Sequence, residues 1–169
     1  MLQQKRALHE KIIVLGSSYG GTVAARLAMD FPKLLDGLIL MSASVEPGKE
    51  TTYWVTYPTS QSTLSWLVPR SLRVANAEKL SHKYELEKMK PHWPNIIAPT
   101  VIMHGDADQL IWPSNARYSE QQLVNAASVE VMMQPTLGHN FIWQGRQYIK
   151  QAILKLVQQP APGKELPTN

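Results

Sequence analysis

Four short runs of apolar residues, separated by segments with helical spacing, are the feature that most restricts how this chain can fold. Uninterrupted apolar runs bounded by turn residues are typical of strands buried on both faces of a parallel sheet. Because the runs alternate with helical segments, we expect an α/β domain with right-handed crossovers. The expected strands are Lys11–Leu15, Gly37–Met41, Thr100–His104 and Val129–Met133, and the last one, which contains Glu130, is expected at an edge of the sheet.

Helices are expected between and after these strands. Apolar residues recur at helical spacing in Thr22–Met29 and again between Ile149 and Val157. Ser114–Val124 follows a proline, as the start of a helix often does. The pattern predicts a parallel sheet of about four strands with flanking helices.

The chain is predicted to be a core interrupted by one long insertion. Its 169 residues are enough for one domain with a hydrophobic core. We expect core segments at residues 1–45 and 96–157 and a disordered, Pro-rich tail at residues 158–169. Residues 46–95 are rich in Ser, Thr, Pro and aromatic residues, with a helical stretch near Ala77–Lys90, and are expected to form a lid-like insertion over the sheet edge. An ordinary crossover helix with long loops is the alternative.

Composition excludes several classes of partner and cofactor. The formal charge is +4, but the lysines and arginines are scattered, so no nucleic-acid partner is expected. The chain has no cysteine, which excludes disulfides and thiolate metal sites. No apolar stretch approaches the roughly 20 residues that span a bilayer, and the first ten residues are polar. We therefore expect a cytoplasmic protein without a membrane span.

The first expected strand runs directly into a G-x-S-x-G sequence, Gly16 to Gly20, and then into a helix. In this setting Ser18 would stand at the apex of a sharp turn with its hydroxyl clear of the sheet. Glycines on either side would remove Cβ atoms that collide as strand and helix approach each other. The amide of Tyr19 would lie at the helix N-terminus and could donate to a developing oxyanion. Without catalysis, the same residues would be a glycine-rich strand–helix turn.

Acidic residues and a histidine follow the third and fourth expected strands. Asp106 and Asp108 come just after the third strand, at the sheet edge where open α/β sheets build their sites, and both compete for one role. His139 follows the fourth strand. It completes the chain order Ser, Asp, His, whereas the other four histidines (His9, His82, His92 and His104) show no comparable setting.

Three stretches together resemble the α/β-hydrolase fold family. KIIVLGSSYGGTVAARLAMDFPKLLDGLILMSA is similar to its nucleophile strand, elbow, helix and next strand, PTVIMHGDADQLIWPSNA to its acid-bearing segment, and LGHNFIW to its histidine loop. The resemblance implies a serine hydrolase, esterase-like, that cleaves a small-molecule ester or similar acyl bond through an acyl-enzyme. It implies Ser18 as nucleophile, Asp108 as acid, His139 as base and the Tyr19 amide as oxyanion donor, with no metal or organic cofactor.

The chain departs from this family pattern at its start. Members of the family normally have four strands before the elbow, and a loop there supplies a second oxyanion donor. Here about ten residues precede the first strand, and they resemble the end of the preceding helix. A bare strand edge tends to pair with another chain, so a homo-oligomer or a pairing N-terminal segment is expected at this edge. The alternative function is therefore a catalytically impaired fragment that acts as, or requires, an association partner.

The expected insertion contains aromatic residues that have two interpretations. Tyr53, Trp54, Tyr57 and Trp66 can line an apolar acyl pocket, or they can pack within the insertion itself.

Overall fold

A computed structural model describes the chain except for residues 1–3, 6, 8, 50–80 and 160–169. Its centre is one parallel sheet with strands in the order β1-β2-β3-β4, which is also their order in the chain. The four predicted strands are confirmed, with ends that differ from prediction by no more than two residues. They are β1 (Ile13–Ser17), β2 (Gly37–Met41), β3 (Thr100–Gly105) and β4 (Val129–Gln134).

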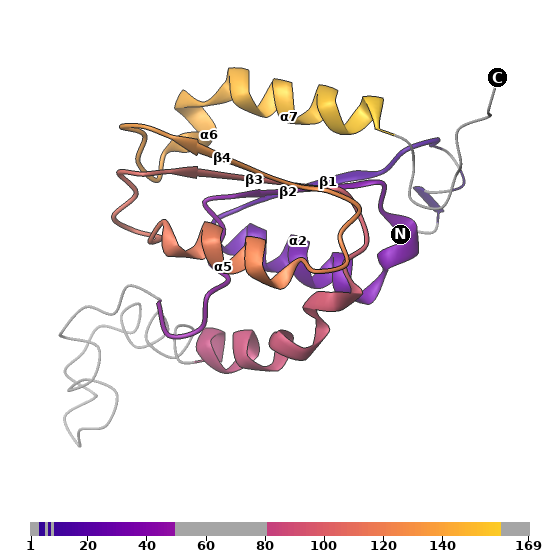
Figure 1. The fold of residues 1–169 in the computed structure, drawn as a ribbon, viewed down its shortest axis with the longest axis horizontal. Helices are drawn as coiled ribbons and strands as arrows, with labels where there is room; N and C mark the ends of the chain where they lie inside the picture. Colours follow the sequence, from indigo (N-terminus) through magenta and orange to yellow (C-terminus); the bar gives the residue numbers. More distant parts are fainter. Residues whose placement is uncertain (1–3, 6, 8, 50–80, 160–169) are drawn as a thin grey trace.

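The two central strands are buried on both faces, which explains why their sequences are uninterrupted apolar runs. Successive side chains of a strand point to opposite faces. In β2 and β3, one set of alternate residues therefore packs against α7 (Arg146–Gln158), whose Ala152 and Leu156 are buried there. The other set packs on the opposite face against α2 (Tyr19–Asp30) and α5 (Ser114–Gln122). The result is a three-layer arrangement, with α7 above the sheet and α2 and α5 below it (Figure 1).

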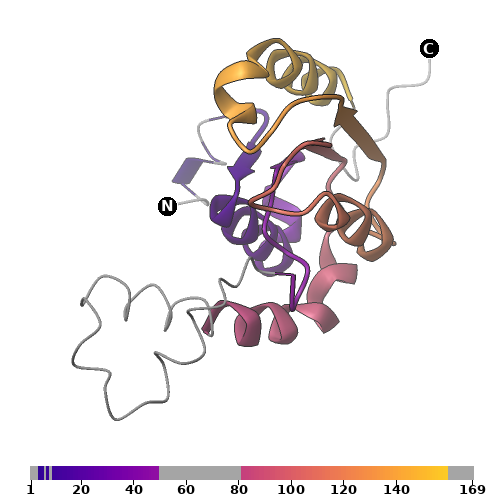
Figure 2. The same cartoon turned by 90° about the vertical axis from the view of Figure 1, so that its left-hand side faces the viewer.

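The parallel strands all end at the same edge of the sheet. Figure 2 turns the molecule so that the strands are seen nearly end-on between the two helical layers. The connections that leave the carboxyl ends of β1, β3 and β4 carry Ser18, Asp108 and His139, respectively. Because open α/β sheets bind ligands at this edge, the topology places the three side chains where a site is expected.

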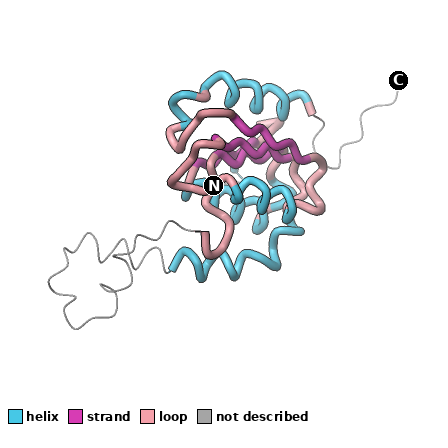
Figure 3. The backbone as a smooth tube through the Cα atoms, turned by 60° about the vertical axis from the view of Figure 1, so that its left-hand side comes forward, coloured by secondary structure: helices cyan, strands magenta, loops and turns pink. Residues whose placement is uncertain are grey.

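Part of the predicted insertion belongs to the helical layers of the core. Residues 81–89 are helical and continue into the 3-10 helix η3 (Lys90–Asn95), and they lie beneath α2 and α5 (Figure 1, and from another side Figure 3). Their apolar side chains Leu86, Met89 and Trp93 join the core that includes Ala25 of α2. The remainder of the insertion, with Tyr53, Trp54, Tyr57 and Trp66, lies outside the described residues. The four segment boundaries and the disordered tail stay predictions.

The two edge strands of the described sheet are the ones expected from the sequence. β1 and β4 are the edge strands of the described sheet, and Leu15 of β1 is 36% exposed. Glu130 of β4 is paired with Lys155 of α7. Two short elements complete the described fold, η1 (Pro32–Leu34) and α6 (Phe141–Gln144). None of the helices in the described part of the chain is long and apolar enough to cross a membrane. The cytoplasmic location stays a prediction.

Candidate active site

The turn between β1 and α2 holds Ser18 in a backbone conformation that is rare for a residue with a side chain. Its φ is 56° and its ψ is −126°. Such a conformation costs on the order of 1–3 kcal/mol and persists only where the surroundings fix it. Three backbone hydrogen bonds do so: Ser18 N donates to Met41 O at 3.0 Å, and Ser18 O accepts from Gly21 N at 2.9 Å and from Ser44 N at 3.1 Å. Although Ser18 is the N-cap of α2, its hydroxyl makes no capping hydrogen bond and is available to other partners.

The three glycines near Ser18 differ in the space that a Cβ atom would have at each position. A Cβ on Gly16 would lie 2.2 Å from Gly20 O, and one on Gly21 would lie 2.3 Å from the Cβ of Ala43. At Gly16, β1 and α2 approach too closely for a side chain, and at Gly21 the helix approaches the segment after β2 too closely. A Cβ on Gly20, the second glycine of G-x-S-x-G, would meet no atom within 4 Å. The expectation that the glycines on both sides of Ser18 prevent a collision is therefore right for Gly16 and wrong for Gly20.

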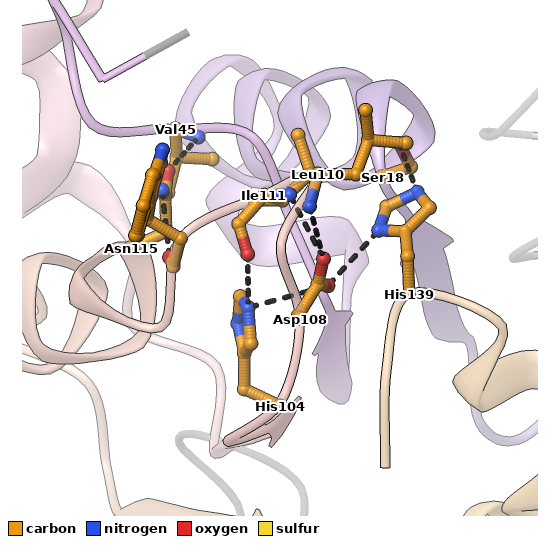
Figure 4. Close-up of polar contacts among 9 residues, drawn as sticks. Ser18, Val45, His104, Asp108, Leu110, Ile111, Asn115 and His139 are labelled. Atoms are coloured by element: carbon orange, nitrogen blue, oxygen red, sulfur yellow. Dashed lines mark hydrogen bonds and ion pairs between the residues drawn. The ribbon is translucent and has the colours of Figure 1, made fainter. Parts of the chain in front are cut away.

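Ser18, His139 and Asp108 form a continuous chain of hydrogen bonds (Figure 4). Asp108 Oδ2 lies 2.9 Å from His139 Nδ1, and His139 Nε2 lies 3.1 Å from Ser18 Oγ. A carboxylate can only accept, so Nδ1 carries the proton and Nε2 is left to accept from the serine hydroxyl. Residues 121 positions apart in the sequence are thus brought into direct contact.

The carboxylate of Asp108 is held at the sheet edge by its own loop. It is 2% exposed, and its Oδ1 accepts hydrogen bonds from Leu110 N at 3.0 Å and from Ile111 N at 2.9 Å. Asp106, the competing acid, is exposed and its Oδ1 accepts from Thr136 N at 2.7 Å. Of the two acids considered from the sequence, Asp108 is the one in contact with His139.

The loops that carry Asp108 and His139 touch at Gly105, the last residue of β3. A Cβ on Gly105 would lie 2.0 Å from Leu137 O, two residues before His139. The same carbonyl accepts a hydrogen bond from Ala107 N at 3.1 Å. Glycine at this position therefore permits the close approach of the loop that carries Asp108 and the loop that carries His139.

Tyr19 is the first residue of α2, directly after Ser18. Its N–H is among the helix-start donors without an intrahelical acceptor, and it lies at the positive end of the helix dipole. Tyr19 is 62% exposed, and the centroid of its ring lies 5.0 Å from that of the His82 ring. Ser44 Oγ is 3.1 Å from His82 Nε2, so the helical residues 81–89 contact the turn that holds Ser18.

His104 lies beside this site, although its place in the sequence did not nominate it. It lies on β3, is 1% exposed, and its Nε2 is 3.6 Å from Asp108 Oδ2. Its Nε2 is also 2.9 Å from Ile111 O, the acceptor to which it donates. Burial lowers the pKa of His104, while the Ile111 carbonyl and Asp108 act in the opposite direction.

Asn115 is a second residue near the site whose part the sequence did not reveal. Its buried Oδ1 accepts from Val45 N and from Glu46 N, both at 2.8 Å, and its Nδ2 donates to Trp112 O at 3.0 Å (Figure 4). It thereby joins the start of the predicted insertion to the end of the acid loop. Among the residues that the structure describes, no three His, Cys, Asp or Glu side chains come together as a metal site would require.

Comparison with known protein families bears on the fold and on the segment that holds Ser18, and not on Asp108 or His139. The family model for the alpha/beta hydrolase fold matches residues 4–73 of the chain. Among curated proteins, none matches the sequence. The resemblance to the α/β-hydrolase fold family is confirmed: the chain carries part of the α/β-hydrolase fold, with four parallel strands and flanking helices.

Solved structures with the same fold include lipolytic enzymes. A monoacylglycerol lipase from Paleococcus ferrophilus superposes with a TM-score of 0.67 at 17% identity, covering 92% of this chain and 71% of that one. A structure from work on two metagenome-derived lipolytic enzymes gives 0.72 at 11% identity, covering 94% and 69%. A thermophilic esterase from Thermogutta terrifontis gives 0.60 at 19% identity, covering 93% and 68%. At these identities the likeness establishes the fold, and the chain spans about two-thirds of the length of each structure.

Proposed function

We propose that the chain is a serine hydrolase that cleaves a carboxylic ester or a similar acyl bond through an acyl-enzyme on Ser18. The observation that carries the proposal is the pair of contacts at His139, 3.1 Å from its Nε2 to Ser18 Oγ and 2.9 Å from its Nδ1 to Asp108 Oδ2. A nucleophile within reach of a base that is itself oriented by an acid is the arrangement that serine catalysis requires.

In the first half of the reaction, His139 Nε2 takes the proton of Ser18 as Oγ bonds to the substrate carbonyl carbon. The carbonyl oxygen becomes an oxyanion, which the Tyr19 N–H at the start of α2 stabilises. Collapse of this intermediate breaks the bond to the leaving group, which departs with the proton from His139. The Asp108 carboxylate stabilises the imidazolium while the proton is held there.

In the second half, water takes the place of the leaving group. His139 removes a proton from the water as its oxygen attacks the acyl carbon, and the proton then returns to Ser18 Oγ as the acid is released. The chemistry uses the hydroxyl, imidazole and carboxylate already in contact and calls for no metal ion or organic cofactor.

A small-molecule ester is the substrate class that this proposal favours. The fold is shared with proteins described as a monoacylglycerol lipase and an esterase. One fold hosts several reactions, so this likeness adds support but does not decide the substrate.

A second candidate is an α/β-hydrolase fragment that acts as, or requires, an association partner. It is favoured by the position of β1 at an edge of the described sheet, where Leu15 is 36% exposed. Strand edges of this kind tend to pair with another chain.

Labelling with a fluorophosphonate, which reacts with activated serines, separates the two candidates. We expect the purified chain to be labelled, Ser18→Ala to abolish the label, and the neighbouring Ser17→Ala to retain it. The absence of labelling in a folded sample would contradict independent catalysis and support the fragment, in particular if a partner chain restored the label.

A further inference from the structure

A second histidine lies behind the carboxylate that orients His139. His104 is 1% exposed on β3, and its Nε2 is 2.9 Å from Ile111 O. A carbonyl oxygen only accepts, so the proton of His104 is on Nε2. The distance of 3.6 Å from the same nitrogen to Asp108 Oδ2 is too long for a hydrogen bond but short enough for an electrostatic contact.

His104 and Asp108 are linked through the backbone of Ile111, which forms a hydrogen bond with each of them. The peptide groups of Ile111 are held from both sides: Ile111 N donates to Asp108 Oδ1 at 2.9 Å, and Ile111 O accepts from His104. Leu110 N donates to the same carboxylate oxygen at 3.0 Å. With Oδ1 occupied in this way, Oδ2 is the oxygen that meets His139 (Figure 4).

The neutral form of the His104 imidazole suits its hydrogen bond to Ile111 and its position beside Asp108. Burial lowers its pKa, which favours the neutral ring. A protonated His104 beside Asp108 would compete with His139 for the negative charge, whereas a neutral one only donates to Ile111.

We propose that His104 is a positioning residue for the reaction at Ser18: by fixing the Ile111 peptide, it holds the Asp108 carboxylate in the orientation in which Oδ2 binds His139 Nδ1. The inference rests on the proposed function, because it assigns His104 a part in the same site. It differs from a packing role, since a packing role would be filled by any buried ring of similar size.

The variants His104→Phe and His104→Gln separate these two roles. Phenylalanine keeps a ring in the core but cannot donate to Ile111, whereas glutamine keeps an N–H donor near the position of Nε2. His92→Phe, a change at an exposed histidine of η3, is the control for the substitution itself. Thermal unfolding shows which variants are folded.

The readout is the tautomer of each histidine, measured from two-bond ¹H–¹⁵N correlations of the ¹⁵N-labelled protein at alkaline pH. In the unsubstituted chain we expect His139 as the Nδ1–H tautomer and His104 as the Nε2–H tautomer. We expect His139 to become a mixture of tautomers in His104→Phe and to keep the Nδ1–H form in His104→Gln and His92→Phe. A change of kcat with KM retained should accompany this, with a loss of up to about 10²-fold in His104→Phe.

Two results would overturn the inference. One is an unchanged His139 tautomer in folded His104→Phe. The other is an Nδ1–H tautomer for His104 in the unsubstituted chain, which requires no variant to fold. Because the tautomers are read without substrate, this outcome is independent of the fluorophosphonate test, whose failure would instead reject catalysis at Ser18.

Discussion

Replacing Gly105 by alanine should disrupt the site without touching any of its polar side chains. The new Cβ would lie 2.0 Å from Leu137 O, and real Cβ atoms essentially never approach another atom closer than 3.0 Å. The Leu137 carbonyl must therefore move by about 1 Å, which displaces the loop that carries His139 two residues later. The carbonyl is also the acceptor of Ala107 N, so this hydrogen bond weakens as well.

Two quantities should change together in Gly105→Ala. Forcing an extra methyl group into a packed position typically costs about 1–3 kcal/mol of the free energy of unfolding. A displacement of about 1 Å at a reacting group can lower the rate by about 10²-fold, and this loss should fall on kcat of ester hydrolysis. Urea unfolding followed by circular dichroism measures the first, and hydrolysis of a p-nitrophenyl ester, or the rate of fluorophosphonate labelling, measures the second.

Gly20→Ala is the matched control, since it adds the same methyl group next to the site where no atom lies within 4 Å. Gly20 is in the first turn of α2, where alanine is a better helix former, so stability should be retained or rise by up to about 1 kcal/mol. Equal stability and equal labelling rates for the two variants would refute the reasoning from close approach.

Three further perturbations test separate parts of the site. Asp108→Asn should lower turnover by up to about 10⁴-fold, because an amide can stabilise the wrong tautomer of His139. Asp106→Asn should have little effect on turnover, and equal losses in the two variants would contradict the choice of Asp108 as the acid. Asn115→Ala leaves the backbone N–H groups of residues 45 and 46 without their acceptor, so the free energy of unfolding, measured in urea, should fall by about 2–4 kcal/mol. The control Asn125→Ala removes one exposed hydrogen bond to Pro94 O and should cost much less. Because the pKa of His104 is lowered by folding, the unfolded chain binds the proton more tightly than the folded one. The free energy of unfolding should therefore fall as the pH drops below about 6.5, by at most about 1.4 kcal/mol per pH unit. His104→Gln should flatten this part of the plot of unfolding free energy against pH, and an unchanged slope would contradict the assignment.

The strands were predictable because burial on both faces leaves a plain signature in the sequence. Gly37–Met41 was predicted with both ends correct, since apolar character begins and ends with the strand. β1 extends to Ser17, beyond the predicted end at Leu15, because pairing with β2 continues into the glycine and serine that precede the turn. α2 likewise begins at Tyr19 rather than Thr22, where the turn rather than helix propensity fixes its start.

The order of a serine, an acidic pair and a histidine after three different strands was enough to nominate Ser18 and His139. That order left Asp106 and Asp108 as competing acids, and only the resemblance to the α/β-hydrolase family favoured Asp108. The supporting residues were not predictable in the same way. His104 and Asn115 act through backbone groups of Ile111, Val45 and Glu46, and the position of these groups depends on the path of the loops. Hydrogen bonds to the backbone have no partner side chain that a sequence pattern could reveal.

The distance along the chain between Ser18 and His139 has a consequence for synthesis. The strand that ends at Ser17 pairs with β2, so a growing chain can form the serine turn early, while its hydrogen-bond partner is encoded 121 positions later. If Ser18 is the nucleophile and His139 the base, as we propose, an unfinished chain carries the serine turn without its base. The hydrogen bond to His139 can form only after β4 and the loop that follows it have been made.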